Sequence, residues 1–342
     1  MADNGIQTIM VTDSGLGGLS VFAAIAGGLA QASSLPRAHL VYFNAWPEPD
    51  KGYNHYPDMA HKARVFDNAL EAMADLEPDM LVIACNTLSV IYPHTPFSRT
   101  TPIFVQDIID QGVGMTAAAL DAHSDTGVIL FSTPTTAESR VHVRKLIRKG
   151  IHPDRIINQG CVNLAGKIER NPFDPDLGNM IQDNVNQAMA KGALLFPTVT
   201  ATLCCTHFGY CRALFASAIA RHTGTPPLLL NPNQGLADQV LFRAGQTVSQ
   251  VGRARTGTVQ SRSRRDQSRP GMVPSTSSMN QSRSRLSTIR GSEPPCITMQ
   301  ILSRVPWEEQ RISAYAALFA PNAPRVAQAL KHYRFTPDLF EI

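Results

Sequence analysis

Two cysteines stand at matching points of the sequence, and their side chains could exchange a proton. Cys85 and Cys205 each follow an apolar, strand-like run, and polar residues come directly after them at 86–87 and 206–207. A free thiol has a pKa of roughly 8.5, so a nearby histidine or helix N-terminus can make it a base near neutral pH. The polar neighbours could hold a thiolate or a carboxylate. Because cysteines are commonly buried, core packing is the alternative for either cysteine alone.

The two cysteine segments belong to a repeat with an offset of 120 residues. Residues 81–87 align with 201–207, and residues 9–13 align with 129–133. In each half an apolar strand ends in a polar residue, and another strand ends in cysteine 72 positions later. Two matched anchors at one offset indicate a duplicated α/β unit. Core packing explains either cysteine, but it does not explain their recurrence at the same place.

A glycine-rich turn, DSGLGG at 13–18, follows the first strand. It is neither a GxGxxG fingerprint nor a P-loop, and the carboxylate of Asp13 would repel a phosphate. A tight strand–helix turn of this kind exposes backbone N–H groups, which suit a substrate carboxylate equally well. The alternative is a helix cap, in which Ser14 or Asp13 accepts hydrogen bonds from free N–H groups. Both interpretations can hold together.

Strand-like and helix-like segments alternate along the chain and must position these residues. The expected strands lie at 6–12, 39–43, 80–84, 103–105 and 127–131, with a proline-rich loop at 46–56 and a helix at 58–76. This alternation predicts an α/β fold in which helices cover both faces of parallel sheets. In such folds the chemistry lies beyond the carboxyl ends of the strands.

The positive charge of the chain is concentrated in one segment. The 342 residues carry a net charge of +4, but residues 251–292 contain nine arginines and a single acid, so the rest of the chain is acidic. That segment is rich in Ser, Arg, Gln and Thr and cannot bury enough apolar surface to fold, which predicts a disordered linker or insertion. We therefore expect no nucleic-acid partner for the folded part. A strand at 297–305 and helices at 307–319 and 323–333 are expected after it.

Several classes of protein are disfavoured by the composition. No run of 18 or more uncharged apolar residues is present, and no secretory signal precedes the first strand, so we expect a cytoplasmic protein without a membrane span. The six cysteines are expected to be reduced thiols. Cys204, Cys205, His207 and Cys211 contain no CxxC pair, and adjacent side chains on a strand point to opposite faces, so we expect no metal site.

Three sequence blocks resemble those of the glutamate racemases, within the aspartate/glutamate racemase superfamily. They are DSGLGGLSV at 13–21, ACNTLSV at 84–90 and CCTHFGY at 204–210. Two weaker stretches, STPTTAES at 132–139 and CVNLAGKIE at 161–169, fit between them, and the order and spacing hold over roughly 6–245.

The resemblance implies two pseudo-symmetric, doubly wound parallel-sheet domains with the active site between them. Together with the strand pattern it predicts a first domain at 1–97, to which 208–245 return, and a second domain at 98–207. A disordered Arg/Ser-rich linker or insertion at 246–296 and a C-terminal strand–helix extension at 297–342 would follow.

The resemblance also implies a cofactor-independent amino-acid racemase, an isomerase that needs no pyridoxal phosphate. Cys85 and Cys205 would face each other across the substrate, one taking the α-proton while the other donates from the opposite side. Asp13 would tune Cys85, and His207 and Glu169 would tune Cys205. The residues implied to hold the substrate's carboxylates and amine are Ser14, Asn86, Thr87, Thr136 and Thr206. The partners implied are a small amino acid and a second copy of the chain, since the family commonly forms homodimers. D-Glutamate for peptidoglycan and cell-wall biogenesis in a bacterial cytoplasm would be its product.

The sequence departs from the family where the substrate side chain is bound. The loop at 46–54 reads WPEPDKGYN, whereas the family usually shows Pro-Tyr-Gly there, and Leu88 and Gly209-Tyr210 replace a small residue and a Pro-Leu pair. Glutamate, which the resemblance implies through both cysteine motifs with Asp13 and His207, is the first hypothesis for the substrate. Aspartate or another amino acid of the same superfamily is the second. A catalytically silent homologue acting through its Arg/Ser-rich segment is the third.

Overall fold

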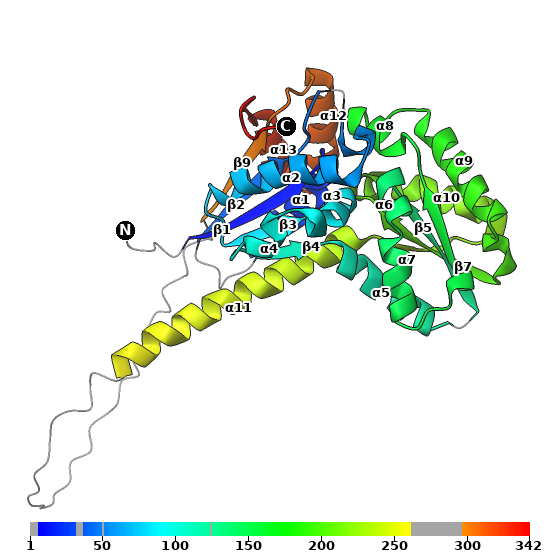
Figure 1. The fold of residues 1–342 in the computed structure, drawn as a ribbon, viewed down its shortest axis with the longest axis horizontal. Coiled ribbons are helices and arrows are strands. Elements are labelled where there is room, and N and C mark those ends of the chain that lie inside the picture. Colours follow the sequence, from blue (N-terminus) through cyan, green and yellow to red (C-terminus); the bar gives the residue numbers. More distant parts are fainter. Residues whose placement is uncertain (1–5, 32–36, 50, 124, 261–295) are drawn as a thin grey trace, which may run out of the picture.

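The structure is a computed structural model that describes residues 6–31, 37–49, 51–123, 125–260 and 296–342, and it contains two parallel β-sheets (Figure 1). The strands of the first sheet are β1 (Gln7–Asp13), β2 (Arg37–Asn44), β3 (Met80–Ile83), β4 (Phe104–Asp107), β9 (Cys296–Ser303) and β10 (Arg334–Phe335). The strands of the second sheet are β5 (Thr126–Ser132), β6 (Ile156–Gly160), β7 (Thr198–Cys204) and β8 (Leu228–Leu230).

The two sheets share one strand order, which supports the predicted duplication. The first runs β10-β9-β2-β1-β3-β4 and the second β6-β5-β7-β8, so 2-1-3-4 in one corresponds to 6-5-7-8 in the other. Every pair of neighbouring strands is parallel. The α/β class with two parallel-sheet units, expected from the sequence, is confirmed.

The strand register moves one anchor of the repeat by a single residue. Thr12 pairs with Ile83 in the first sheet, and the corresponding pair in the second sheet is Phe131 and Leu203. The offset is thus 120 for β3 and β7, as predicted, but 119 for β1 and β5. The counterpart of Asp13 is therefore one residue earlier than predicted. Strands buried on both faces are apolar at every position, so their pattern does not fix the register.

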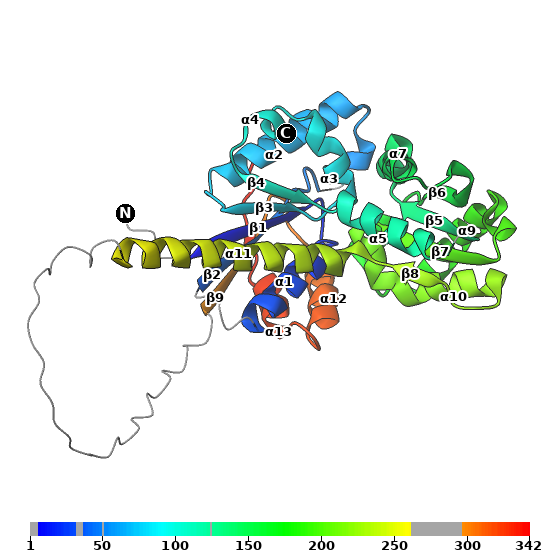
Figure 2. The same ribbon diagram turned by 90° about the horizontal axis from the view of Figure 1, so that it is seen from below.

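Helices cover both faces of each sheet, as Figures 1 and 2 show. The α-helices are α1 (Leu19–Gln31), α2 (Met59–Ala74), α3 (Asn86–Ile91), α4 (Phe97–Thr100), α5 (Ile109–Asp121), α6 (Pro134–Ser139), α7 (Val141–Arg148), α8 (Leu164–Arg170), α9 (Leu177–Ala190), α10 (Arg212–Thr223), α11 (Pro232–Gln260), α12 (Glu309–Phe319) and α13 (Pro324–Lys331). The 3-10 helices are η1 (Tyr53–His55), η2 (Tyr92–His94), η3 (Pro153–Arg155), η4 (Ala193–Leu195) and η5 (Thr206–Cys211). In the first unit α1, α11, α12 and α13 pack on one face and α2 and α3 on the other. In the second unit α8, α9 and α10 oppose α5 and α7.

Hydrogen bonding between strands places two segments differently from the ranges predicted for the domains. β4 was expected in the second domain, but it pairs with β3 in the first sheet. β8 was expected to return to the first domain, but it pairs with β7 in the second sheet. The C-terminal strand β9 pairs with β2 along its whole length and so belongs to the first sheet. Short strands of two to four residues carry too little pattern to show which sheet they join.

The segment expected to be a linker begins with helix. α11 continues through Gln260, so the expectation of disorder from residue 246 is wrong for its first fifteen residues. A helix that has already formed extends at the gain of one hydrogen bond per residue, which lowers the need for an apolar face. The rest of that expectation, 261–295, lies outside the described residues.

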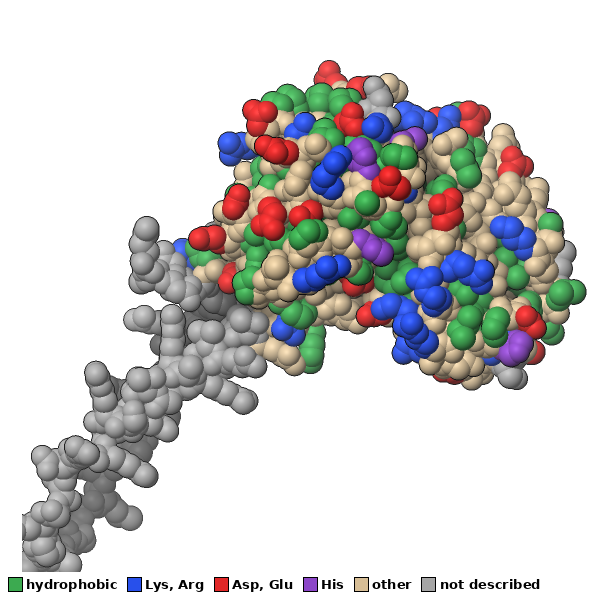
Figure 3. Space-filling view, in the orientation of Figure 1, with side chains coloured by type: hydrophobic (Ala, Val, Ile, Leu, Met, Phe, Trp, Pro, Cys, Tyr) green, Lys and Arg blue, Asp and Glu red, His purple; other side chains and the backbone are tan. Residues whose placement is uncertain are grey.

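The surface carries mixed charge on the face drawn in Figure 3. Basic side chains gather over the second unit, where α7 supplies the exposed Arg144 and Arg148. Lys145 on the same helix is paired with Asp110 at 2.5 Å. None of the helices in the described ranges is both long and apolar enough to cross a membrane.

Candidate active site

A cavity of about 470 Å³ lies where the carboxyl ends of the two sheets meet. Six of its lining residues stand one or two positions after a strand, one for each of β1, β2, β3, β5, β6 and β7: Ser14, Trp46, Cys85, Thr133, Cys161 and Cys205. Each unit thus contributes the ends of three strands. This is the place at which doubly wound folds bind ligands, and the cavity is of the size that small-molecule sites have.

Cys85 lies at the mouth of the first unit, directly before α3. Its sulfur is 3.2 Å from the hydroxyl of Ser14, which follows β1. Burial raises the pKa of the Cys85 thiol well above its usual range, and the negative charge of nearby Asp13 raises it further. Cys85 therefore rests as a thiol that can donate a proton.

Asp13 is fully buried behind the cavity wall rather than on it. The hydroxyl of Thr206 donates to Asp13 Oδ2 at 2.8 Å, whereas Oδ1 has no hydrogen-bond partner in the described part of the chain. Burial raises the pKa of Asp13 from 3.8 to about 6, although the charge of His207 and the Thr206 hydrogen bond lower it in part. Asp13 can therefore influence Cys85 by its charge without touching a ligand.

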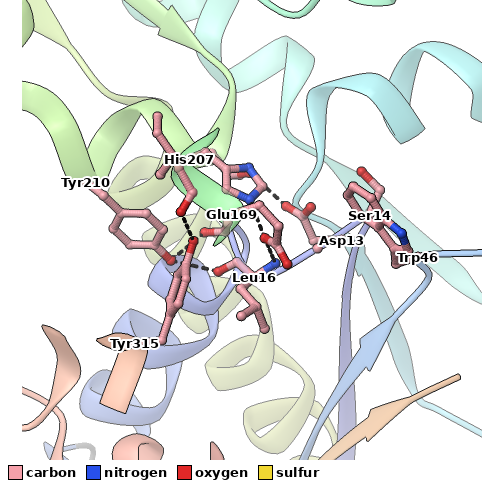
Figure 4. A network of polar contacts seen from close by, with 12 residues as sticks. Asp13, Ser14, Leu16, Trp46, Glu169, His207, Tyr210 and Tyr315 are labelled. Atoms are coloured by element: carbon pink, nitrogen blue, oxygen red, sulfur yellow. Dashed lines mark hydrogen bonds and ion pairs between the residues drawn. The ribbon is translucent and has the colours of Figure 1, made fainter. Parts of the chain in front are cut away.

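Cys205 belongs to a buried chain of three polar side chains. Its sulfur is 3.8 Å from His207 Nδ1. His207 Nε2 is 2.7 Å from Glu169 Oε2, and both of these side chains are drawn in Figure 4. Burial lowers the pKa of His207, but its hydrogen bonds to Cys205 and Glu169 raise it well above the usual value. A protonated imidazole is thereby held beside Cys205, where it would attract the charge left when that thiol gives up its proton.

The glycine-rich turn fits against this chain of residues. Leu16 N donates to Glu169 Oε2 at 2.7 Å, which ties the turn of the first unit to α8 of the second. A Cβ on Gly17 would approach the Thr206 hydroxyl to 2.3 Å and the imidazole of His207 to 2.6 Å. Glycine at this position is therefore required by the close approach of the two units.

Four of the five residues predicted to hold substrate lie on the cavity wall: Ser14, Asn86, Thr87 and Thr206. Asn86 is 2% exposed, and neither its Oδ1 nor its Nδ2 has a hydrogen-bond partner within the described ranges. Leaving both atoms of a buried amide unpaired is costly. Asn86 is therefore set up to donate to and accept from a ligand at once.

The fifth residue, Thr136, is not on the wall. It is buried behind Thr133, whose hydroxyl donates to it at 3.1 Å, and Thr133 itself lines the cavity. Thr133 is also 2.9 Å from Thr87, across the boundary between the units. Because α6 begins directly after Thr133, the helix turns Thr136 inward. Of the five predicted catalytic residues, Cys85, Cys205 and His207 line the cavity, and Asp13 and Glu169 stand behind it.

Sequence reasoning did not assign a role to several lining residues. Four of them lie in the loop at 46–54, which the resemblance places at the substrate side chain only as a whole: Trp46, Gly52, Tyr53 and Asn54. The others are His55, Thr133, Pro134, Cys161, Val162, Asn163, Ala165, Gly166 and Arg170. Thr133 and Cys161 directly follow β5 and β6, so the rule that sites lie at strand ends could have found them. Arg170 directly follows the block at 161–169 that ends in Glu169, and this position is the signal that could have found it. Among the described residues no group of three His, Cys, Asp or Glu side chains is placed to hold a metal ion.

Contacts between the units flank the cavity. Lys62 on α2 is 8% exposed, and its ammonium donates to the Thr135 hydroxyl at 3.0 Å. The backbone N–H of Thr135 donates to Asn54 Oδ1 at 3.3 Å. A side chain of the loop at 46–55 is thereby tied to α6 of the other unit.

Comparison with known proteins gives a consistent picture. No family model matches the chain. It is 28% identical over 246 residues to the glutamate racemase of Actinobacillus pleuropneumoniae serotype 5b (strain L20), which covers 70% of this chain and 83% of the relative. The crystal structure of glutamate racemase from Thermus thermophilus in complex with β-chloro-D-alanine has a TM-score of 0.54 at 18% identity, covering 97% and 96% of the two chains. Glutamate racemase from Francisella tularensis in complex with D-glutamate has a TM-score of 0.53 at 18% identity, covering 96% and 95%.

The sequence comparison and the structural comparison support different conclusions. The sequence match covers most of the curated relative, and the structural matches, at low identity, show a shared fold. The resemblance to the glutamate racemases and the fold expected from it are thereby confirmed. The names of the sequence relatives support an amino-acid racemase, which is an isomerase.

Proposed function

We propose that the chain is a glutamate racemase that interconverts L- and D-glutamate by proton transfer between Cys85 and Cys205. The observation that carries the proposal is one cavity lined by two cysteines from corresponding strands of the two units. A role in supplying D-glutamate for peptidoglycan, a homodimeric state and a cytoplasmic location follow from the same resemblance and stay predictions.

In the proposed reaction one thiolate takes the α-proton, and the electron pair of the C–H bond stays on the substrate carbon. The opposite thiol then donates its proton to that carbon from the other side and becomes a thiolate, so the next turnover can run in reverse. The resting state is uneven. Burial and Asp13 keep Cys85 protonated, whereas a protonated His207 lies with its Nδ1 3.8 Å from the sulfur of Cys205.

The wall of the cavity favours an anionic amino acid. Arg170 is the one lysine or arginine among the lining residues described, and none of them is an aspartate or glutamate. Asn86 offers both a donor and an acceptor, and Ser14, Thr87 and Thr206 offer hydroxyls. An α-ammonium with two carboxylates matches this set, because hydrogen bonds to charged groups are the stronger ones.

The proposal is tested by incubating the protein with L- and D-forms of glutamate, aspartate and other amino acids in deuterated water. Chiral chromatography measures inversion, and NMR measures exchange of the α-proton. We expect both with glutamate. Inversion of aspartate alone would assign the substrate of the second hypothesis, which the altered loop at 46–54 favours. An absence of exchange and inversion with every amino acid would sink the racemase proposal.

Replacing Arg170 with glutamine should weaken binding of the substrate more than it slows chemistry. Its side chain reaches the cavity. The hydrogen bond from Lys167 lowers the pKa of nearby Asp174 most, and the charge of Arg170 adds a smaller effect. Losing one exposed charge-assisted contact should raise KM for glutamate about three- to tenfold, with a smaller change in kcat.

Lys167→Gln is the matched control, since Lys167 lies on the same helix but pairs with Asp174 and Asp176 outside the cavity. Steady-state kinetics of both variants would check the prediction. An equal rise in KM in the two variants would contradict a contact made by Arg170 itself.

A further inference from the structure

Glu169 is held from two sides by different parts of the chain. Its Oε2 accepts from Leu16 N and lies 2.7 Å from His207 Nε2. Its Oε1 is 3.7 Å from a guanidinium nitrogen of Arg311 on α12. The Arg311 side chain is 16% exposed, and Glu169 is 4% exposed at the side chain, so the pair is largely shielded from solvent. The two carboxylate oxygens therefore have separate partners.

Arg311 reaches this place because α12 is fastened to the end of α8. Tyr315, one helical turn after Arg311, is fully buried, and its hydroxyl donates to Ile168 O at 3.0 Å. That carbonyl is one of those left free at a helix C-terminus. The ring of Tyr315 also meets the ring of Tyr210 edge-on at 5.6 Å (Figure 4). Arg311 and Tyr315, on one face of α12, thus contact the consecutive residues Glu169 and Ile168 of α8.

We propose that Arg311 is a positioning residue for the Cys205 half of the proton transfer, acting through Glu169 and His207. The inference rests on the proposed function and deepens it. A carboxylate with one partnered oxygen can rotate and exchange the oxygen that faces the imidazole. Arg311 holds Oε1 so that Oε2 stays directed at His207, which in turn keeps its Nδ1 toward Cys205.

The arrangement is one-sided, which gives the proposal a distinctive consequence. Through the described residues Arg311 reaches Cys205 by a chain of direct contacts with Glu169 and His207. Cys85, whose sulfur lies against Ser14, is linked to that chain more weakly, through the charge of Asp13. Enantiomers have equal free energy in water, so any loss in kcat/KM must be equal in the two directions. A defect confined to Cys205 must instead appear as a difference between the two enantiomers in how often the α-proton exchanges with solvent without inversion.

The direction of that effect follows from which cysteine is impaired. If Cys205 reprotonates slowly, the enantiomer that Cys85 deprotonates gets its proton back from Cys85 more often. By then the proton has been replaced from solvent, so exchange without inversion increases. For the enantiomer that Cys205 deprotonates, abstraction itself is slow, and exchange without inversion does not increase.

The test compares Arg311→Gln with the unaltered protein in deuterated water, using L- and D-glutamate separately. We expect kcat/KM to fall about tenfold in both directions, a part of what a general acid–base group supplies. We expect the ratio of exchange to inversion to rise at least threefold for one enantiomer only. The affected enantiomer should be the one that still exchanges in a Cys205→Ser variant. Arg311→Lys, which restores a positive charge, should recover part of the loss.

Two further variants separate positioning from a loss of structure. Arg325→Gln removes another C-terminal arginine, which lies on α13 and donates to Ile297 O at 2.5 Å, and should leave the ratio unchanged. Tyr315→Phe removes the hydrogen bond between α12 and α8 but keeps Arg311. Thermal unfolding of every variant measures the loss of stability, so this variant shows how much activity is lost when α12 is held less firmly. A symmetric loss, or no loss, in a folded Arg311→Gln protein would overturn the inference while leaving the racemase proposal intact. If the wild-type protein neither inverted any amino acid nor exchanged its α-proton, the proposed function would be overturned, and this inference with it.

Discussion

Replacing either Cys85 or Cys205 with serine is expected to abolish racemisation, with a loss of about 10²- to 10⁴-fold in kcat/KM. A serine hydroxyl is close in size to the thiol but far less acidic, so it neither takes nor gives the α-proton at neutral pH. Because each cysteine comes from a different unit, the two variants should fail differently. Each should exchange the α-proton of one enantiomer without inversion, and the two enantiomers should be opposite.

Chiral analysis and NMR of the exchanged proton measure both parts of this result. Cys204→Ala is the matched control, because Cys204 is buried next to Cys205 but packs into the core on the opposite face of the second sheet. It should retain turnover while losing some stability, as expected for a small cavity in a core. If Cys85→Ser and Cys205→Ser both retained inversion, the proton would have to move through other groups.

The strand ends could be predicted from the sequence because they depend on local pattern. Ser14, Cys85 and Cys205 each follow an apolar run, and the carboxyl ends of parallel strands meet at one edge. His207 comes two residues after Cys205 and therefore lies at the same strand end. These residues lie together in the cavity because the topology brings them there, whatever the register of β1 and β5 is.

The residues that the sequence did not reveal depend on contacts between distant segments. Tyr315 and Ile168 are 147 positions apart, and no periodicity or turn signal relates them. The strand at 297–305 was expected, but its place beside β2 was not, because the sequence of a strand does not identify the strand that it pairs with. Thr136 was preferred to Thr133 for a different reason: the family motif is linear, whereas the start of α6 decides which threonine faces the cavity.

The same separation explains why Arg311 has no sequence signal of its own. It lies beyond the segment 251–292, past the part of the chain in which the racemase blocks occur. The pairing of β9 with β2 returns the C-terminal helices to the first sheet, where Arg311 and Tyr315 of α12 contact α8. The site is therefore completed by a region whose role depends on the tertiary fold.

Replacing Asp13 with asparagine is expected to stabilise the fold at neutral pH while it lowers activity. Burial raises the pKa of Asp13 from 3.8 to about 6, so the folded protein binds this proton more tightly than the unfolded chain does. Below about pH 3.8, where Asp13 is protonated in both the folded and the unfolded state, it does not lower the free energy of unfolding. The cost grows as the pH rises from there and is complete above about pH 6.

The size of this cost follows from proton linkage. Each tenfold change in proton affinity corresponds to about 1.4 kcal/mol, so the ionised Asp13 costs the folded state about 3 kcal/mol at pH 7 and above. Asparagine is neutral and can still accept from Thr206, but its N–H₂ group would lie where Oδ1 has no partner among the described residues. Part of the gain is lost to that buried amide, so about 1–2 kcal/mol should remain.

Unfolding by urea at several pH values would measure the difference between the two proteins. Asp13→Asn should be more stable than the unaltered chain at pH 8, and the advantage should vanish or reverse as the pH falls through about 6 toward about 4. Asp75→Asn, which alters an exposed aspartate at the end of α2, is the control for the loss of one carboxylate away from the cavity. A constant difference across the whole range would show that the stability effect of Asp13 does not come from its ionisation. If the charge of Asp13 serves catalysis at Cys85, the Asp13→Asn variant should combine lower turnover with higher stability. Holding that buried charge lowers the free energy of unfolding of the unaltered protein.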